Sequence, residues 1–273
     1  EVVGVIGDPV AHSLSPRLHN AAFDALGLDW VSVGFRVPAG QAATALTGAA
    51  ALGLRGLSVT MPHKEAAARA VDRLGIEAAA LDAVNCVVFD EGRTVGENTD
   101  GAGLVAALRR GSGFEPEGQR CCVVGAGGAG RAAVLGLAGA GAAEVVVLNR
   151  TRARAEAAVA LAGGAGRLGT PEDAATCQLV VNATPLGMAD AGGGDAWPLE
   201  PAFLHPGQVV VDLVYHPRRT RWLQAAEGVG AAVHNGIGML VHQAALQVTR
   251  WTGREAPVEA MWAAVPADDE EPS

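Results

Sequence analysis

The chain has 273 residues, a formal net charge of −9 and an aromatic content of only 4%. That length allows two domains, each able to bury its own core of small aliphatic side chains. The acidic balance argues against non-specific nucleic-acid binding, which needs clustered Lys and Arg, and no uncharged stretch reaches membrane-spanning length.

The four cysteines form no CxxC pair and have no His at metal-ligand spacing, so no metal site is predicted. They are expected to be buried, reduced thiols. The chain also shows no basic segment followed by an apolar run and a small-residue cleavage site. We therefore expect a cytoplasmic protein that acts as a monomer or a homodimer, with a small-molecule substrate and neither nucleic acid nor membrane as a partner.

The first hundred residues predict alternating strands and helices. Runs rich in β-branched residues predict strands at residues 2–6, 30–37, 56–60 and 84–89. Helical patterns lie between them, at residues 15–27, 40–52 and 63–81. Ser15 is placed to cap the first helix, with Pro16 in its first turn. A polar turn at residues 90–93 then leads into a short return strand.

A second core begins after a helical pattern at residues 101–110 and a connector rich in Gly and Pro at residues 111–118. Strands are predicted at residues 120–124, 144–148, 178–182 and 208–214. Helical patterns fall between most of them, which is the order of a doubly wound parallel sheet. Residues 236–264 are helical again with no strand left to follow, so we expect them to pack back on the first domain.

A glycine-rich loop follows the strand at residues 120–124 and opens a helix; it consists of Gly125, Ala126, Gly127, Gly128, Ala129 and Gly130. Its glycines fit the G-x-G-x-x-G pattern of dinucleotide-binding loops. Without Cβ atoms the backbone turns sharply, and a pyrophosphate can approach the unpaired N–H groups of the helix N-terminus. In a chain with 37 glycines the pattern could arise by chance, but the flanking strand and helix favour a dinucleotide site.

The end of the second strand of this domain favours NADP over NAD. NAD-binding folds usually place Asp or Glu there to bind the ribose 2′-hydroxyl. This chain instead has Asn149, Arg150 and Thr151, followed by Arg154. Guanidinium groups and a Thr hydroxyl suit a 2′-phosphate, which a carboxylate would repel. We therefore assign the loop and these four residues to NADP(H), and interpret Arg152 as part of a solvated helix face.

Four polar clusters in the first domain stand at strand ends and turns, where a packed core least needs them. They occupy residues 7–20, 58–64, 83–86 and 96–101. In composition and order these clusters resemble the shikimate dehydrogenase family, and the resemblance covers nearly the whole chain. It implies an α/β protein with an open α/β substrate-binding domain and a Rossmann-type doubly wound parallel-sheet NADP domain, with the active site in the groove between them.

The resemblance also implies boundaries and roles. The substrate-binding and catalytic domain would comprise residues 1–100 and 238–273, and the NADP domain residues 101–237. The substrate carboxylate would be bound by Ser13 and Ser15. The ring hydroxyls would be bound by Thr60, Asn85 and Asp100. The catalytic pair would be Lys64 and Asp100.

In the second half, residues 182–188 resemble the family's cofactor-side loop, and residues 212–215 and 235–240 resemble a strand end and a return helix. The implied substrate contacts are Tyr215 and Gln243. The implied cofactor contacts are Thr184, Leu213, Gly236 and Met239. Two residues depart from the family: Ser58 stands where Asn is more usual, and Cys86 stands where Thr is more usual, which removes a hydroxyl beside Asn85.

The implied reaction is the NADP-dependent, reversible reduction of 3-dehydroshikimate to shikimate, a step towards chorismate and the aromatic amino acids. Hydride addition to a ketone places negative charge on the carbonyl oxygen, which a protonated Lys64 held by Asp100 can stabilise and protonate without a metal. The alternative, that Lys64 is only a solvated first-turn lysine, is disfavoured because Thr60, Asn85 and Asp100 lie at similar edges. His12 and His19 are interpreted as ordinary polar residues of a loop and a helix.

Two other functions remain open. A quinate/shikimate dehydrogenase that uses NAD would share the substrate residues, but it would prefer an acidic residue near Asn149 and Arg150. A non-catalytic module that senses shikimate would be expected to lose Lys64 or Asp100, and both are present.

Overall fold

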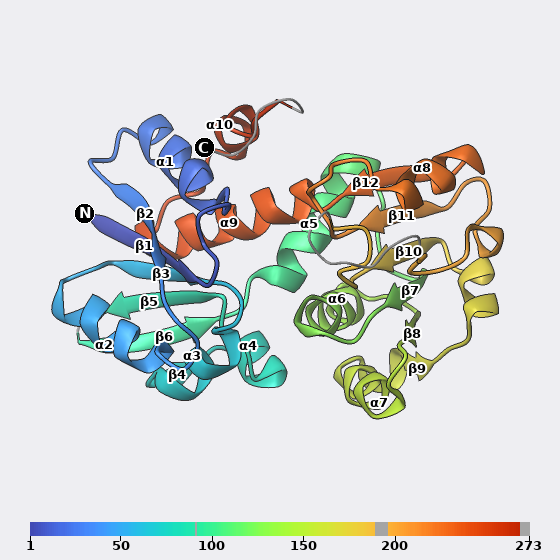
Figure 1. The fold of residues 1–273 in the computed structure, drawn as a ribbon, viewed down its shortest axis with the longest axis horizontal. Helices are drawn as coiled ribbons and strands as arrows, with labels where there is room; N and C mark the ends of the chain where they lie inside the picture. The colour runs from blue at the N-terminus through green and yellow to red at the C-terminus, as the bar shows by residue number, and fades with distance from the viewer. Residues whose placement is uncertain (91, 189–195, 268–273) are drawn as a thin grey trace. The chain divides into compact units, whose positions relative to one another are not determined.

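A computed structural model of the chain describes residues 1–90, 92–188 and 196–267. The chain divides into two compact units, Glu1–Thr99 with Val241–Ser273 (unit 1) and Asp100–Leu240 (unit 2). Each unit is built on a six-stranded sheet with helices against it (Figure 1). This is the α/β class that the sequence predicts. Among the described residues, no helix combines the length and apolarity needed to cross a bilayer.

Unit 1 contains a mixed sheet with strand order β2-β1-β3-β5-β6-β4. The strands are β1 (Val2–Gly7), β2 (Val31–Arg36), β3 (Gly56–Val59), β4 (Arg73–Leu74), β5 (Cys86–Asp90) and β6 (Arg93–Glu97). β1 pairs in parallel with β2 and β3, whereas β5 runs antiparallel to β3 and β6. The predicted turn between β5 and β6 includes Glu91, which lies outside the described residues.

Helices cover both faces of this sheet. They are α1 (Ser15–Ala25), α2 (Ala42–Ala51), α3 (Lys64–Ala70), α4 (Ile76–Leu81), the later part of α9 (Ile237–Thr252) and α10 (Val258–Ala263). Side chains of α2, α3 and α4 form one core with the sheet, around Leu46, Ala67, Ala78 and Leu57. α9 packs on the sheet through Trp251, whose indole N–H donates to the main-chain oxygen of Val87 at 3.0 Å. The C-terminal helical segment thus belongs to unit 1.

Unit 2 contains an entirely parallel sheet with strand order β12-β11-β10-β7-β8-β9. Its strands are β7 (Arg120–Val124), β8 (Glu144–Leu148), β9 (Gly166–Leu168), β10 (Leu179–Asn182), β11 (Val209–Asp212) and β12 (Ala232–Asn235). Starting from β7, the order is that of the Rossmann fold, in which ligands bind at the carboxyl ends of the strands.

The helices of unit 2 are α5 (Asp100–Ser112), α6 (Gly128–Gly139), α7 (Arg152–Leu161) and α8 (Arg221–Gly228), with short 3₁₀ turns at Gly163–Ala165, Pro171–Thr176 and Pro201–Phe203. Successive residues of β7 point to opposite faces. Cys121 lies in the core beneath α5, α6 and α7, and Cys122 in the core beneath α8. Both faces of the sheet are therefore buried.

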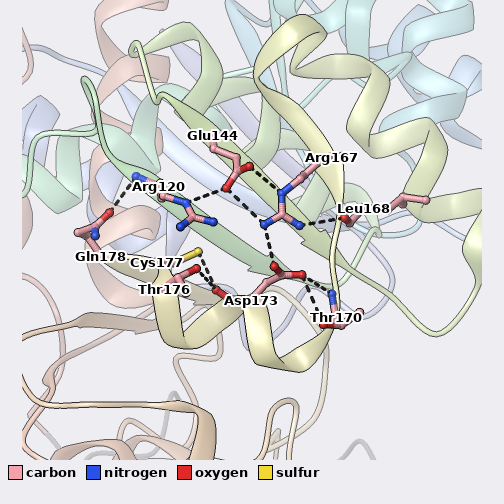
Figure 2. Close-up of polar contacts among 9 residues, drawn as sticks. All are labelled: Arg120, Glu144, Arg167, Leu168, Thr170, Asp173, Thr176, Cys177 and Gln178. Carbon is pink, nitrogen blue, oxygen red and sulfur yellow. Dashed lines mark hydrogen bonds and ion pairs between the residues drawn. The ribbon is translucent and has the colours of Figure 1, made fainter.

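An ion-pair network joins the amino ends of β7 and β8 to β9 and the 3₁₀ turn after it (Figure 2). Glu144 accepts from Arg120 at 2.8 Å and from Arg167 at 2.6 Å, and Arg167 also binds Asp173 at 2.8 Å. Hydrogen bonds with Arg167 and with the main chain of Thr170 lower the pKa of Asp173 to about 2. The network lies at the amino ends of the strands, whereas the glycine-rich loop lies at their carboxyl ends. We therefore assign the network to the stability of unit 2 and not to the candidate site.

Two sequence predictions of secondary structure are wrong. The single helix predicted over residues 63–81 is interrupted by β4, because Asp72 is bonded to Thr94 of β6. The main-chain N–H of Asp72 donates to Thr94 Oγ1 at 2.8 Å, and its Oδ2 accepts from Thr94 N at 2.7 Å and from Thr94 Oγ1 at 2.8 Å. Strands β9 and β12 were not predicted. Both are short edge strands that gain their pairing from β8 and β11 rather than from a local pattern.

Candidate functional site

The glycine-rich loop connects β7 to α6 at the carboxyl edge of the parallel sheet. The loop is tied to β8 by two bonds, from Gly125 N to Leu148 O at 2.8 Å and from Ala126 N to Asn149 Oδ1 at 3.1 Å. α6 begins at Gly128, with Gly127 at the cap position. The predicted context, with a strand before the loop and a helix after it, is confirmed. Asn149 also acquires a role in holding the loop.

The glycines of this loop fall into two kinds. Gly125 has φ +108°, and a Cβ on Gly130 would lie 2.0 Å from Gly125 O, so these two are required by the protein's own packing. A Cβ on Gly127 or Gly128 would meet nothing within 4 Å. Packing therefore leaves the surface over Gly127 and Gly128 open, at the N-terminus of an α-helix of 12 residues. Such a surface suits a pyrophosphate.

The basic residues after β8 also separate into two kinds. Arg152 donates to Glu156 at 2.8 Å, one turn later in α7, which agrees with its interpretation as part of a solvated helix face. Arg150 and Arg154 are exposed and form no ion pair with any residue that the structure describes. Thr151, between them and also exposed, precedes the first residue of α7. The two guanidinium groups are thus available to an anionic ligand.

The ends of β10 and β11 are joined by buried polar side chains that had no assigned role in the sequence. Asn182 donates to Asp212 Oδ1 at 2.9 Å, and both side chains are wholly buried. Burial raises the pKa of Asp212, although Thr220 donates to its other oxygen at 2.7 Å. Asn182 Oδ1 accepts from the main chain and the hydroxyl of Thr184 at 2.9 and 2.7 Å. This pair therefore fixes the position of Thr184.

The remaining predicted residues of unit 2 follow β11 and β12. A Cβ on Gly236 would lie 2.1 Å from Leu213 O, so the two segments approach at a distance that only glycine permits. Met239, in the first turns of α9, packs on the unit 2 core. Tyr215 is half-buried, and burial raises the pKa of its hydroxyl.

Ser13 and Ser15 lie at the start of α1, but the predicted cap is wrong. Leu14 occupies the cap position with helical angles, and Ser15 is the first helical residue with its side chain buried. Ser13 Oγ accepts from Ser15 N at 3.3 Å. Ser13 therefore performs the capping that was predicted for Ser15, because a hydroxyl two residues earlier reaches the unpaired N–H of the first turn.

Thr60 and Lys64 stand on either side of the turn between β3 and α3. The imidazole of His63 is buried and lies 2.7 Å from Val37 O, and His63 N donates to Thr60 O at 2.9 Å. Lys64 is the first residue of α3, is half-buried, and accepts through its main-chain oxygen from Val84 N at 2.9 Å. This turn therefore links Lys64 to the segment that carries Asn85.

Asn85, Thr99 and Gln243 are brought together in the core of unit 1. Asn85 Nδ2 lies 3.0 Å from Thr99 Oγ1 and 3.3 Å from Gln243 Oε1, and Thr99 N donates to Asn85 Oδ1 at 2.8 Å. Asp100 follows Thr99 directly and begins α5 in unit 2. Because Lys64 lies in unit 1 and Asp100 in unit 2, their pairing stays a prediction.

Known proteins resemble this chain over nearly its whole length. Residues 5–87 match the family described as shikimate dehydrogenase substrate binding domain, residues 109–169 the shikimate / quinate 5-dehydrogenase family, and residues 236–265 the shikimate 5′-dehydrogenase C-terminal domain. A Methanopyrus kandleri protein named shikimate dehydrogenase (NADP(+)) is 46% identical, over 97% of this chain and 94% of that protein. The chain belongs to the shikimate dehydrogenase family.

Solved structures agree with this membership of the shikimate dehydrogenase family. The Thermus thermophilus shikimate 5-dehydrogenase, in complex with NADP(H) and shikimate, has a TM-score of 0.88 and 38% identity, over 96% of this chain and 97% of that one. A quinate dehydrogenase from Corynebacterium glutamicum in complex with NAD has a TM-score of 0.85 and 30% identity, over 96% and 97% of the two chains.

The two departures from the shikimate dehydrogenase pattern leave the polar core of unit 1 intact. The side-chain amide of Asn85 bonds to Thr99 and Gln243, so its orientation does not depend on a hydroxyl at residue 86. Cys86 is itself wholly buried, and this burial raises the pKa of its thiol. Ser58 is also buried, within β3.

Proposed function

We propose that this shikimate dehydrogenase catalyses the NADP-dependent, reversible reduction of 3-dehydroshikimate to shikimate in aromatic amino acid biosynthesis. One structural observation carries the cofactor assignment. The glycine-rich loop, which is open over Gly127 and Gly128, is hydrogen-bonded to Asn149, and the next residue is Arg150, which forms no ion pair with a described residue. The substrate assignment is supported by the near full-length similarity to NADP-dependent shikimate dehydrogenases.

The residues of unit 2 fit NADP. The N–H groups around Gly127 and Gly128 would bind the pyrophosphate, with Gly125, Ala126, Ala129 and Gly130 shaping the loop. Arg150 and Arg154, with Thr151 and Asn149, would hold the 2′-phosphate, since guanidinium groups form charge-assisted bonds with phosphate oxygens. Thr184, Leu213, Gly236 and Met239 would line the remainder of the cofactor site. NADPH, when bound, supplies the hydride.

Residues of unit 1 would bind the substrate and move the proton. The hydroxyls of Ser13 and Ser15 bind its carboxylate. Its ring hydroxyls are contacted by Thr60, Asn85 and Asp100, and Tyr215 and Gln243 also face the substrate. In the reduction, the ammonium of Lys64 donates a proton to the oxygen of the former carbonyl, while the Asp100 carboxylate orients the ammonium. In the oxidation, Lys64 accepts that proton.

Two alternatives have weaker support. An NAD-dependent quinate dehydrogenase would be expected to have an acidic residue after β8, where this chain has Asn149 and Arg150. A sensing module would not need both Lys64 and Asp100. A spectrophotometric assay of shikimate or quinate with NADP or NAD distinguishes these functions, because activity with shikimate and NADP should exceed activity with the other three pairs.

Removing the proton donor tests the chemistry. Lys64→Ala should lower kcat by roughly two to four orders of magnitude, the usual range for a general acid, while NADP affinity is retained. Asp100→Asn should also lower kcat steeply. The double variant should be little worse than the worse single variant, because groups that act as a unit are non-additive. Near-normal kcat in Lys64→Ala, or losses that multiply, would exclude this pair.

We also propose that the enzyme acts in the cytoplasm as a monomer or a homodimer, on small molecules and without nucleic acid. The support is chemical: all four cysteines are buried and unpaired, as expected in a reducing compartment, and the chain is acidic overall.

A further inference from the structure

We propose, on the basis of the function proposed above, that Gln247 is a positioning residue that fixes the orientation of the Gln243 carboxamide towards the substrate. Gln247 follows Gln243 by one turn of α9, and its side chain is wholly buried. Its amide nitrogen lies 2.9 Å from Gln243 Oε1 and 3.0 Å from the main-chain oxygen of Asn85. Gln247 thus bonds to two residues that the proposed function assigns to the substrate.

The main chain of Asn85 determines which way each amide faces. A carbonyl oxygen only accepts hydrogen bonds, so the Gln247 atom that faces Asn85 O must be the nitrogen. The same nitrogen faces Gln243, and therefore the Gln243 atom at 2.9 Å must be its oxygen. An unambiguous main-chain acceptor thus fixes two side-chain amides in succession.

A second, independent main-chain group gives the same result. Thr99 N only donates, so the Asn85 atom at 2.8 Å must be Oδ1. Asn85 Nδ2 is then directed towards Thr99 Oγ1 and Gln243 Oε1. Both routes place the oxygen of Gln243 against protein donors and its NH₂ group on the other side. A substrate hydroxyl at Gln243 is therefore recognised through its oxygen, as an acceptor.

His19 of α1 is a neighbour of Gln247 in the core of unit 1. Oε1 of Gln247 and Nε2 of His19 are both buried, and neither has a hydrogen-bond partner among the described residues, whereas His19 Nδ1 lies 3.0 Å from Ser32 Oγ. The His19 ring packs edge-on against Trp251, with centroids 4.9 Å apart. Burial lowers the pKa of His19 to about 3, against a smaller upward contribution from Gln247. The ring is therefore neutral, and His19, which the sequence analysis interprets as an ordinary polar residue of a helix, is a histidine of the core.

Loss of the Gln247 amide should disturb Gln243 more than the fold. Asn85 O still accepts from Val59 N at 2.8 Å, and Gln243 Oε1 keeps the Asn85 donor at 3.3 Å. Asn85 O therefore keeps a hydrogen-bond donor, whereas Gln243 Oε1 loses the 2.9 Å bond from Gln247. Gln247→Met, which keeps the length of the side chain, isolates this effect.

In Gln247→Met, KM for shikimate should rise about tenfold, the usual value of one neutral hydrogen bond, with little change in kcat or in KM for NADP. The matched control is Val248→Ala, which removes a fully buried neighbour in α9 that has no side-chain polar contact. It should lower Tm and leave KM for shikimate unchanged. If Gln247→Met does not fold, Gln247→Asn provides the same test, because a shorter side chain withdraws the amide from Gln243.

A double-variant cycle separates positioning from general support of the fold. In a Gln243→Ala background, Gln247→Met should raise KM no further, because the group that it positions is gone. An unchanged KM in Gln247→Met alone, or equal increases with and without Gln243, would overturn the inference. Failure of the unmodified enzyme to oxidise shikimate with NADP would instead overturn the proposed function.

Discussion

Replacing Arg150 and Arg154 together by Gln should change cofactor preference without changing the fold. Both side chains are exposed, and neither forms an ion pair with a described residue. Their removal therefore breaks no such contact within the protein. Any loss of activity should therefore come from weaker binding of the cofactor. Only NADP carries the 2′-phosphate that the two guanidinium groups are proposed to bind.

The size of the effect follows from the exposure of the site. A hydrogen bond to a charged group contributes about 1.5 to 3 kcal/mol, and exposure to solvent favours the lower end of that range. Two such bonds give about 3 kcal/mol, which corresponds to a change in KM for NADP of roughly 150-fold. KM for NAD should change by less than about threefold, because NAD has an uncharged 2′-hydroxyl in place of the phosphate and so loses no ionic interaction with the two guanidinium groups.

Steady-state assays with saturating shikimate and varied NADP or NAD measure this change directly. Arg152→Gln is the matched control, because Arg152 stands between the two residues but bonds to Glu156, so both cofactors should be unaffected. Equal losses of NADP and NAD in the Arg150 and Arg154 double variant, or a loss of NADP in Arg152→Gln, would refute the assignment.

Three further predictions follow from the local geometry. Gly127→Val should abolish NADP binding in calorimetry, because the new side chain would occupy the surface proposed for the pyrophosphate. The fold and shikimate binding should be retained, because the backbone angles of Gly127 suit any residue and a Cβ there meets no protein atom. Loss of shikimate binding would contradict this prediction. Ser13→Ala and Ser15→Ala should each raise KM for shikimate by about tenfold to a hundredfold, and only Ser13→Ala should lower Tm, because Ser13 Oγ accepts from Ser15 N. Arg167→Ala should destabilise unit 2 at neutral pH by about 1 kcal/mol after allowance for solvent exposure. Arg167, together with the main chain of Thr170, lowers the pKa of Asp173 from 3.8 to about 2, so this difference is complete only above about pH 5 and should be lost as the pH falls through 2. A difference in unfolding free energy that is constant between pH 5 and pH 2 would be the contrary result.

Local patterns were sufficient for the parts of the fold that are buried on both faces. The strands β7, β8, β10 and β11 are continuous runs of Val and Cys or Leu, and their order in the chain predicted the Rossmann unit. The failures are non-local. The alanine-rich residues 63–81 give a continuous helical pattern, but Asp72 bonds to Thr94, more than twenty residues away, and this pairing interrupts the helix. A local pattern contains no information about that partner.

The candidate site shows the same division. The glycine-rich loop and the basic residues after β8 lie in contiguous segments, so their spacing predicted an NADP site. The sequence could not show that Gly127 and Gly130 are glycines for different reasons, one facing open space and one the main chain of Gly125. It also assigned the helix cap to Ser15 rather than Ser13, because both residues precede the same helical pattern and only the backbone angles separate them.

Gln247 marks the limit of what residue types alone can predict. A glutamine within an apolar helix is unusual, because burying a side-chain amide costs free energy that hydrogen bonds must offset. That rule predicts partners without naming them, and here one partner, Asn85, lies 162 positions earlier in the chain. A fixed orientation is what the proposed role of Gln243 needs, because an amide NH₂ only donates to a substrate hydroxyl and an amide oxygen only accepts from it, so a flip would change the bond that is offered. The orientation of the Gln243 carboxamide is therefore set within the core of unit 1 by main-chain groups, which do not vary with residue type, and the proposed recognition of a ring hydroxyl rests on that orientation.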